Sequence, residues 1–307
     1  MHSCQNDSYI STSDLTELNS HRVIPRRLID NANFSTYSNE QKVQRWALAT
    51  LYNSLNGGEW TMNNGWTEDS EECTWYGLVC DTSGSVIALE LNDNNLRGVL
   101  EVEFVLLSKI GKFCKSGMHS TLASFPGHIN IRFAQTEFVV LNTNLIWGFP
   151  PSIFSMPLLR VLDLDKNKLD EIPSGITTPS GGSRLEELYL SYNKIASIPD
   201  EMFQLRNVTC LWMSNNQISA AIPSGFGMMA KLEELDLELN YFTGSIPTEI
   251  FNLQKLRSLY LHDNSLSGTL SSSFSLMTSL EVLDLDTNHI SGVVPTQIGL
   301  FSKLSEL

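Results

Sequence analysis

Apolar residues alternate with other residues in short pairs along the C-terminal two-thirds of the chain. An asparagine follows each pair at a fixed distance, as in Leu162 and Leu164 before Asn167. Alternation of this kind predicts a short strand with one buried face. From Asn167 onward the asparagines are 26, 23, 24, 24 and 24 residues apart, so the chain repeats one unit. The asparagines in register are Asn94, Asn167, Asn193, Asn216, Asn240, Asn264 and Asn288.

The remainder of each unit predicts how the chain returns to the next strand. In the clearest copy Gly244 and Pro247 follow Asn240, and apolar residues then recur three apart from Ile250. Proline fixes φ and biases the residue before it toward extended structure. We expect the buried asparagine amide to satisfy backbone groups of the turns above and below it. Since no unit can bury its own apolar face, the units must stack into a solenoid.

The unit resembles a known repeat. It reads L-x-x-L-x-L-x-x-N-x-L-x-G-x-I-P-x-x-I-x-x-L-x-x and is similar to the 24-residue leucine-rich repeat of plant-type receptor-like protein and receptor kinase ectodomains and secreted inhibitor proteins, over residues 83–307. The resemblance implies an α/β solenoid, a right-handed horseshoe or superhelix with short parallel strands on its concave face. An array of paired helices is the alternative, but the Gly and Pro in the units would break regular helices.

Residues 39–82 precede the repeats and are predicted to cap them. Apolar residues at helical spacing lead to a Gly-Gly pair and then to Cys73-Thr-Trp-Tyr-Gly-Leu-Val-Cys80. That segment resembles the C-x-W-x-G-[VI]-x-C cap of plant-type repeats, with Leu78 as a departure. The resemblance implies a helical cap closed by a Cys73–Cys80 disulfide. A metal site is the alternative, but no second cysteine pair or histidine cluster is nearby.

One stretch breaks the register. Residues 114–139 lack the Leu-x-Leu strand and the asparagine, and the pattern resumes at Leu141 and Asn144. From Asn94 to Asn144 is 50 residues, and removal of these 26 leaves one period of 24. Three hypotheses stay open: a degenerate repeat, a loop extruded from the solenoid, and a translated intron.

The two ends of the chain and its cysteines indicate in which cellular compartment the protein is expected to lie. Residues 1–38 are polar, are predicted to be disordered and lack the features of a signal peptide, while residue 307 falls partway through a truncated last repeat. We interpret the chain as a fragment, or an incomplete gene model, of a secreted or membrane-tethered ectodomain. A disulfide implies an oxidising compartment, and Asn33 and Asn207 are glycosylation candidates. No apolar run approaches the roughly 20 residues of a membrane span, so this segment is not expected to insert directly.

Charge and motifs narrow the function. Lys and Arg number 20 against 34 Asp and Glu, a net charge of −14, which argues against nucleic acid or an anionic membrane as partner. The phosphate-loop, G-x-S-x-G and H-E-x-x-H motifs are absent. We therefore expect no enzyme activity, no cofactor and no metal.

The residues flanking the inward leucines should stand in columns on the concave face, because coils stack about 4.8 Å apart. In seven coils, 9 of 21 such positions are acidic and none is Lys or Arg. One interpretation is a groove for a basic protein or peptide segment, with aromatic anchors and steering carboxylates. A solvated strand face is the other. The candidate partner-binding residues are Tyr189, Trp212, Asp236, Glu238, Tyr260, His262, Asp284 and Asp286.

His262 is expected to lie between Glu238 and Asp286 in one column, because each of the three follows the second leucine of its Leu-x-Leu pair. Two neighbouring carboxylates favour the protonated form of an imidazole. Binding of a ligand at this end is therefore predicted to change near mildly acidic pH.

These patterns predict a non-catalytic leucine-rich repeat module that binds a protein or peptide, an extracellular or cell-surface ectodomain of the receptor type. Two alternatives remain: a structural or adhesive cell-surface repeat protein, and the ligand-binding fragment of a larger receptor kinase.

Overall fold

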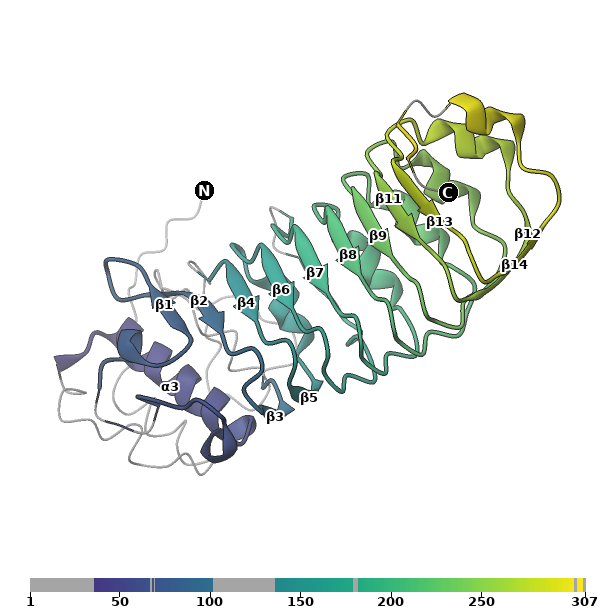
Figure 1. The fold of residues 1–307 in the computed structure, drawn as a ribbon. Coiled ribbons are helices and arrows are strands. Elements are labelled where there is room, and N and C mark those ends of the chain that lie inside the picture. Colours follow the sequence, from purple (N-terminus) through teal and green to yellow (C-terminus); the bar gives the residue numbers. More distant parts are fainter. Residues whose placement is uncertain are drawn as a thin grey trace.

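The computed structural model describes residues 36–66, 68, 70–101, 136–178, 182–300 and 303–305. The chain forms an elongated array with a cap at one end (Figure 1). Strands line one face of the array and short helical turns line the opposite face, as in an α/β solenoid. Within the described residues, no helix combines the length and the apolar character needed to cross a membrane.

The cap is built on helix α3 (Asn39–Ser54). Ser38 caps the start of the helix with a capping box. The Ser38 hydroxyl accepts the Gln41 N–H, and the Gln41 side-chain oxygen accepts the Ser38 N–H. The 3-10 turns η2 (Gly57–Glu59) and η3 (Glu72–Thr74) and strand β1 (Leu78–Cys80) follow. A disulfide joins Cys73 to Cys80. In the tail that is predicted to be disordered, residues 1–35 lie outside the described residues, whereas Ser38 belongs to the cap.

The main sheet has nine strands in the order β1-β2-β4-β6-β7-β8-β9-β11-β13. Strand β1 is antiparallel to β2, and the strands from β2 onward pair in parallel. From β6 onward each repeat strand buries its central leucine and leaves the residues on either side half-exposed, as the alternation predicts. The repeat strands are β2 (Val86–Glu90), β4 (Phe138–Val140), β6 (Val161–Asp163), β7 (Glu187–Tyr189), β8 (Cys210–Trp212), β9 (Glu234–Asp236), β11 (Ser258–Tyr260) and β13 (Val282–Asp284). We refer to the solvent side of this sheet as the concave face.

Shorter elements complete the coils. Strands β3 (Arg97–Val99) and β5 (Leu145–Gly148) pair with each other, and β10 (Thr243–Gly244), β12 (Ser265–Thr269) and β14 (His289–Ser291) form a three-stranded sheet. The helical turns opposite the main sheet are of the 3-10 type, which suits apolar residues three apart. They are η5 (Pro151–Ser155), η6 (Asp200–Gln204), η7 (Ser224–Met228), η8 (Thr248–Asn252), η9 (Ser272–Leu276) and η10 (Thr296–Leu300).

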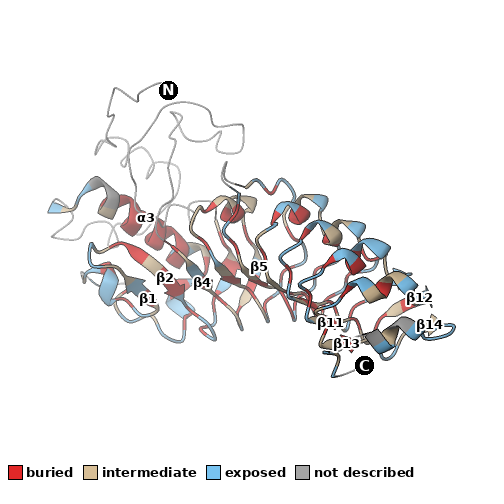
Figure 2. Ribbon diagram, turned by 90° about the horizontal axis from the view of Figure 1, so that it is seen from above, coloured by how far each residue is buried: buried red, intermediate tan, exposed pale blue. Residues whose placement is uncertain are grey.

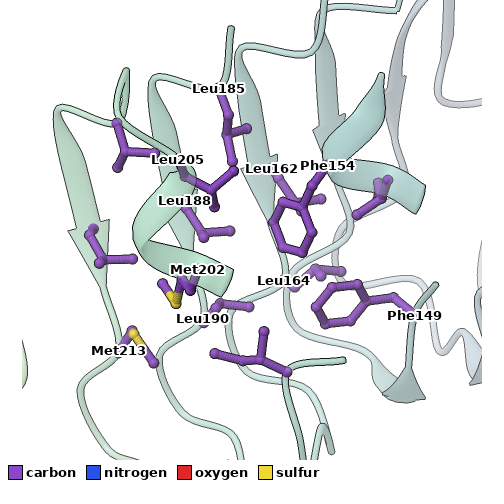
Figure 3. Close-up of a cluster of buried hydrophobic side chains, with 14 of the residues drawn as sticks. Phe149, Phe154, Leu162, Leu164, Leu185, Leu188, Leu190, Met202, Leu205 and Met213 are labelled. Carbon is purple, nitrogen blue, oxygen red and sulfur yellow. The ribbon is translucent and has the colours of Figure 1, made fainter. Parts of the chain in front are cut away.

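The core runs along the inside of the array. Buried residues lie between the main sheet and the inner sides of the helical turns, whose outer sides are exposed (Figure 2). In a central section, Leu162 and Leu188 of β6 and β7 meet Phe154, Met202 and Leu205 from the helical side (Figure 3). Each coil therefore buries its apolar face only against its neighbours.

The repeated asparagine forms a ladder between coils. Asn216 Nδ2 donates to the carbonyls of Met213 and Ser214 in its own coil at 3.0 and 3.2 Å. It also donates to the Leu190 carbonyl of the preceding coil at 2.9 Å, and its Oδ1 accepts from Ile195 N at 3.0 Å. The predicted role is confirmed, although each amide bridges its own turn and the preceding coil only. The pattern recurs at Asn144, Asn167, Asn193, Asn240, Asn264 and Asn288.

The irregular stretch differs from the sequence prediction. Strand β4 lies directly between β2 and β6, and Asn144 Oδ1 accepts from the Asn94 and Leu96 N–H groups at 3.1 and 2.9 Å. Strand β2 thus pairs directly with β4. Residues 138–139 belong to β4 rather than to the insert. The rest of the insert lies within residues 102–135, outside the described residues, and the degenerate-repeat, loop and intron hypotheses stay predictions.

Candidate functional site

The strand pairings place five of the eight candidate residues in one row across the concave face. Their backbones lie opposite one another from β7 to β13, and their side chains are half-buried. Glu238, His262 and Asp286 follow the ends of three of these strands. The row consists of Tyr189, Trp212, Asp236, Tyr260 and Asp284.

Two aromatic rings in this row form a fixed unit with two carboxylates. The rings of Tyr189 and Trp212 meet edge to face, with centroids 4.9 Å apart. Tyr189 Oη donates to Glu187 Oε2 at 2.8 Å, and Trp212 Nε1 donates to Glu234 Oε1 at 3.0 Å. Glu187 and Glu234 flank inward leucines and so belong to the columns, but neither is among the predicted partner-binding residues. The signal was an acidic residue beside each aromatic in the same or the next coil.

The thiol beside this unit is held in its protonated form. Cys210 is a free cysteine whose Sγ lies 4.0 Å from Glu234 Oε2. Burial, and then the charge of Glu234, raises the pKa of the Cys210 thiol to about 12. A thiol of such high pKa is a poor nucleophile, so Cys210 is a packing residue of the site.

Two half-buried carboxylates have raised pKa values. Burial is the main reason that the pKa of Asp236 is raised to about 6, against hydrogen bonds from Ser214 and the Glu238 backbone. Burial, and then the charge of Asp163, raises the pKa of Asp165 to about 7. Asp165 also belongs to the columns but is not among the predicted partner-binding residues. Burial of such charges is unfavourable unless a cation compensates it.

Part of the acidity has a local structural role. Asp163, Asp236 and Asp284 each accept, through Oδ1, the backbone N–H two residues ahead at 3.1 Å. Aspartate commonly stabilises a turn in this way. The solvated-face interpretation therefore accounts for one oxygen of each of these carboxylates, while Oδ2 of Asp163 accepts from the Asn142 amide and Oδ2 of Asp284 faces His262.

His262 gathers three carboxylates, with one correction. Its Nδ1 lies 3.1 Å from Glu238 Oε2 and 3.0 Å from Asp284 Oδ2, and its Nε2 lies 3.9 Å from Asp263 Oδ2. The backbone of His262 lies between those of Glu238 and Asp286, as predicted, but the second carboxylate that faces its ring is Asp284 and not Asp286. Asp284 Oδ1 holds the Asp286 N–H, which leaves Asp284 Oδ2 to face His262, while Asp286 is exposed. The pH dependence of binding stays a prediction.

Arginine and lysine lie beside the concave face rather than on it. Arg160 pairs with Glu186 at 2.7 Å and Arg257 with Glu281 at 3.0 Å, just before the strands, and Lys166 lies over the Tyr192 ring after β6. Strand β4 adds Phe138, Val140 and Asn142 to the columns, and none of these is basic. Among the described residues, no Lys or Arg stands in the columns, although the charges of Lys166 and Arg160 act on Asp165 and Glu187 from beside them.

The other predicted sites are placed as follows. Asn207 is half-buried; its amide donates to the Ser183 carbonyl and its oxygen accepts from Lys231 Nζ at 2.7 Å. Asn33 lies outside the described residues. In the part of the chain that the structure describes, no group of three or more His, Cys, Asp or Glu side chains is arranged to hold a metal ion.

Comparison with known sequences identifies the repeats. A family model described as leucine rich repeat matches residues 183–242 and 231–290. Lumican of Mus musculus is 33% identical over 123 residues, which cover 39% of this chain and 34% of lumican. Receptor-like protein 6 of Arabidopsis thaliana is 26% identical over 202 residues, which cover 57% of this chain and 19% of that protein. The chain thus spans 34% and 19% of the length of these two relatives.

Solved structures agree. The leucine-rich repeat ectodomain of the plant membrane receptor kinase GASSHO1/SCHENGEN3 from Arabidopsis thaliana, in complex with CASPARIAN STRIP INTEGRITY FACTOR 2, matches 80% of this chain and 27% of that chain with a TM-score of 0.66 and 26% identity. The plant peptide hormone receptor RGFR1, in complex with RGF2, matches 55% of this chain and 27% of that chain with a TM-score of 0.51 and 31% identity. Residues 183–290 therefore match the leucine rich repeat family, and the chain is similar to plant receptor-like proteins and receptor kinase ectodomains.

Proposed function

We propose that this protein is a non-catalytic recognition module that binds a basic protein or peptide segment on its concave face. The observation that carries the proposal is the row from Tyr189 to Asp284, where aromatic rings stand beside half-buried carboxylates that have no Lys or Arg partner. Tyr189 and Trp212 act as anchors. Asp236, Glu238 and Asp284 select a cationic ligand.

The energetics favour a cationic ligand. Asp236 is half-buried, and its raised pKa reflects the cost of holding its charge away from water. A lysine or arginine side chain of a ligand would supply the missing countercharge in a partly desolvated place, where ion pairs are stronger than in water. Trp212 beside it offers the flat apolar surface that interface anchors use. The net charge of −14 would also steer a basic ligand toward the protein.

The similar proteins support an extracellular ligand-binding role. One solved relative is the ectodomain of a membrane receptor kinase in complex with a named integrity factor, and another is a peptide hormone receptor in complex with RGF2. The Cys73–Cys80 disulfide agrees with an oxidising compartment. We infer an extracellular or cell-surface location, with Asn207 as a candidate glycosylation site.

A second candidate is the ligand-binding part of a larger receptor kinase. The observation that favours it is the match of 80% of this chain to 27% of a receptor kinase ectodomain chain. Both candidates use the same concave face, and the sequence of the full-length transcript distinguishes them by a membrane span followed by a kinase domain.

The test is selection of a phage-displayed library of random 12-residue peptides on the protein. We expect Lys and Arg to be enriched, and we expect Trp212→Ala to weaken the selected peptides about thirtyfold, as for an interface anchor. Asp236→Asn keeps the oxygen that accepts the Glu238 N–H but removes the charge, and should reduce the preference for basic residues. Tyr192→Ala, an exposed aromatic outside the row, is the matched control. Equal binding by wild type and Trp212→Ala would refute the proposal.

A further inference from the structure

The concave face is divided into two chemically different parts. Next to the cap, the first column of the sheet is apolar across four neighbouring strands, from β1 to β6. The pairings place Val79 opposite Ala88, Ala88 opposite Phe138, and Phe138 opposite Val161. Val79 and Phe138 are large apolar side chains that are 43% and 37% exposed, Val161 is half-exposed, and Ala88 between Val79 and Phe138 is buried. We call these four residues the apolar row.

The same column becomes acidic at the next strand. Val161 pairs with Glu187, Glu187 with Cys210, and Cys210 with Glu234. The aromatic unit of Tyr189 and Trp212 stands beside this switch. The apolar row is therefore continuous with the proposed binding site, and it is not an isolated patch elsewhere on the protein.

One of the two charges beside the apolar row is already engaged, whereas Glu90, next to Ala88 on β2 and opposite Val140, is exposed. Asp163, beside Val161 on β6, accepts the Asp165 N–H through Oδ1 and the Asn142 side-chain amide through Oδ2. Val140, next to Phe138 on β4, is half-exposed. The surface around Phe138 thus offers apolar contact to a ligand, whereas the surface from β7 onward offers carboxylates. An exposed apolar area next to polar groups is typical of a binding surface.

The spacing sets the length of segment that can use both parts. Four strand steps separate Phe138 on β4 from Asp236 on β9, which is about 19 Å at about 4.8 Å per step. An extended peptide advances about 3.3 Å per residue, so about six residues cover this span. Side chains an even number of residues apart point to the same side of an extended segment, and both can then face the sheet.

Resting on the function proposed above, we propose that the ligand is an extended peptide segment with an apolar side chain against Phe138 and Val161 and a lysine or arginine about six residues away on Asp236 beside Trp212. The carboxylates of the columns would repel an acidic segment, and no Lys or Arg in the columns would offset that repulsion. A second copy of the chain meets the same objection, because its own concave face is acidic.

The experiment uses peptides from the random 12-residue library described above. We expect the selected sequences to pair an aromatic or large aliphatic residue with Lys or Arg at a spacing of five to seven residues. Phe138→Ser should weaken the best selected peptide about tenfold, since most of an apolar contact is lost. Leu276→Ser, which removes an apolar side chain of similar exposure (47%) from η9 on the opposite side, should leave binding unchanged.

A double-mutant cycle identifies the contact. The selected peptide with its apolar residue replaced by serine should bind wild type about tenfold more weakly, and Phe138→Ser should weaken this altered peptide no further. Basic peptides selected without the apolar residue, or full binding by Phe138→Ser while Trp212→Ala loses it, would overturn this inference alone. Absence of any selected basic peptide would instead overturn the proposed function. Unchanged thermal unfolding of each variant shows that the loss arises at the contact.

Discussion

The cap and the concave face treat charge in opposite ways. In the cap, Arg45 is fully buried, pairs with Glu72 at 2.6 Å, donates to the Ser70 carbonyl at 3.1 Å and lies over the Trp75 ring at 5.1 Å. On the concave face, Asp236 is half-buried without a Lys or Arg partner. Charges that are satisfied internally specify the fold of the cap. Charges left unpaired lower the stability of the free protein, and a ligand that supplies the countercharge would offset that cost.

The largest expected effect comes from breaking the buried pair of the cap. Glu72→Gln leaves the charge of Arg45 without its carboxylate inside the protein. Removal of one partner of a buried ion pair typically lowers the free energy of unfolding by about 3–5 kcal/mol. Urea denaturation followed by tryptophan fluorescence measures the loss, since Trp66 and Trp75 are buried in the cap.

Replacement of both partners is the control. Arg45→Met with Glu72→Leu removes both charges and should recover most of the stability, because apolar substitutes of similar volume often match a buried pair. If Glu72→Gln alone costs less than about 1 kcal/mol, the pair does not specify the cap, and the contrast with the concave face fails.

A smaller effect of opposite sign is expected on the concave face. The pKa of Asp165 is about 7 in the folded protein, above its value near 4 in an unfolded chain. The folded state therefore binds this proton more tightly, and the associated stability is present below pH 4 and is lost as the pH rises through 7. Asp165→Asn removes the charge but keeps an oxygen for the Ser191 N–H. At pH 8 it should raise the free energy of unfolding by about 1–2 kcal/mol.

Urea denaturation at several pH values measures this gain. It should shrink as the pH falls from 8 and vanish below pH 4, where Asp165 is protonated in both the folded and the unfolded state. The same gain at pH 8 and at pH 4 would mean that the substitution acts through packing or hydrogen bonding, and that burial of the charge does not destabilise this face.

The smallest effect is expected at an ion pair on the surface, which tests whether burial or pairing decides the energetics of such contacts. Arg257 and Glu281 form a pair as short as many buried ones, 3.0 Å, but their side chains are exposed. Water and salt screen such a pair, and two long side chains lose freedom in forming it. Arg257→Met should leave the melting temperature unchanged within error in differential scanning calorimetry. A drop similar to that of Glu72→Gln would show that pairing, rather than burial, decides the energetics of these contacts.

Local pattern was enough to predict most of the fold. Leu188, Leu190 and Asn193 each act within one coil and its immediate neighbour, so their spacing alone specifies a strand, a turn and a bridging amide. Strand β4 was missed in part because Val139 stands where leucine is usual and the residues before it lack the repeat pattern. Burial of Val139 depends on β2 and β6 on either side, and β2 is about 50 residues away in sequence.

The candidate site was predicted by position but not by contact. The row from Tyr189 to Asp284 followed from the alternation, because side chains on one face of parallel strands in register must form columns. The partners within it did not follow. Glu187 and Glu234 bind the aromatic polar atoms, and Asp284 replaces Asp286 beside His262, because side-chain conformation decides which of two nearby carboxylates turns inward.

The sequence by itself determined that the chain is a stacked array of leucine-rich repeats with a capped end and an acidic strand face. These properties arise from a period that each coil satisfies with its nearest neighbours. The tertiary structure alone decided that β2 and β4 are adjacent across the irregular stretch, that an apolar row therefore precedes the acidic surface, and which carboxylates remain without a partner. Such properties depend on the order of strands in space and on desolvation, and both arise only when distant parts of the chain are packed together.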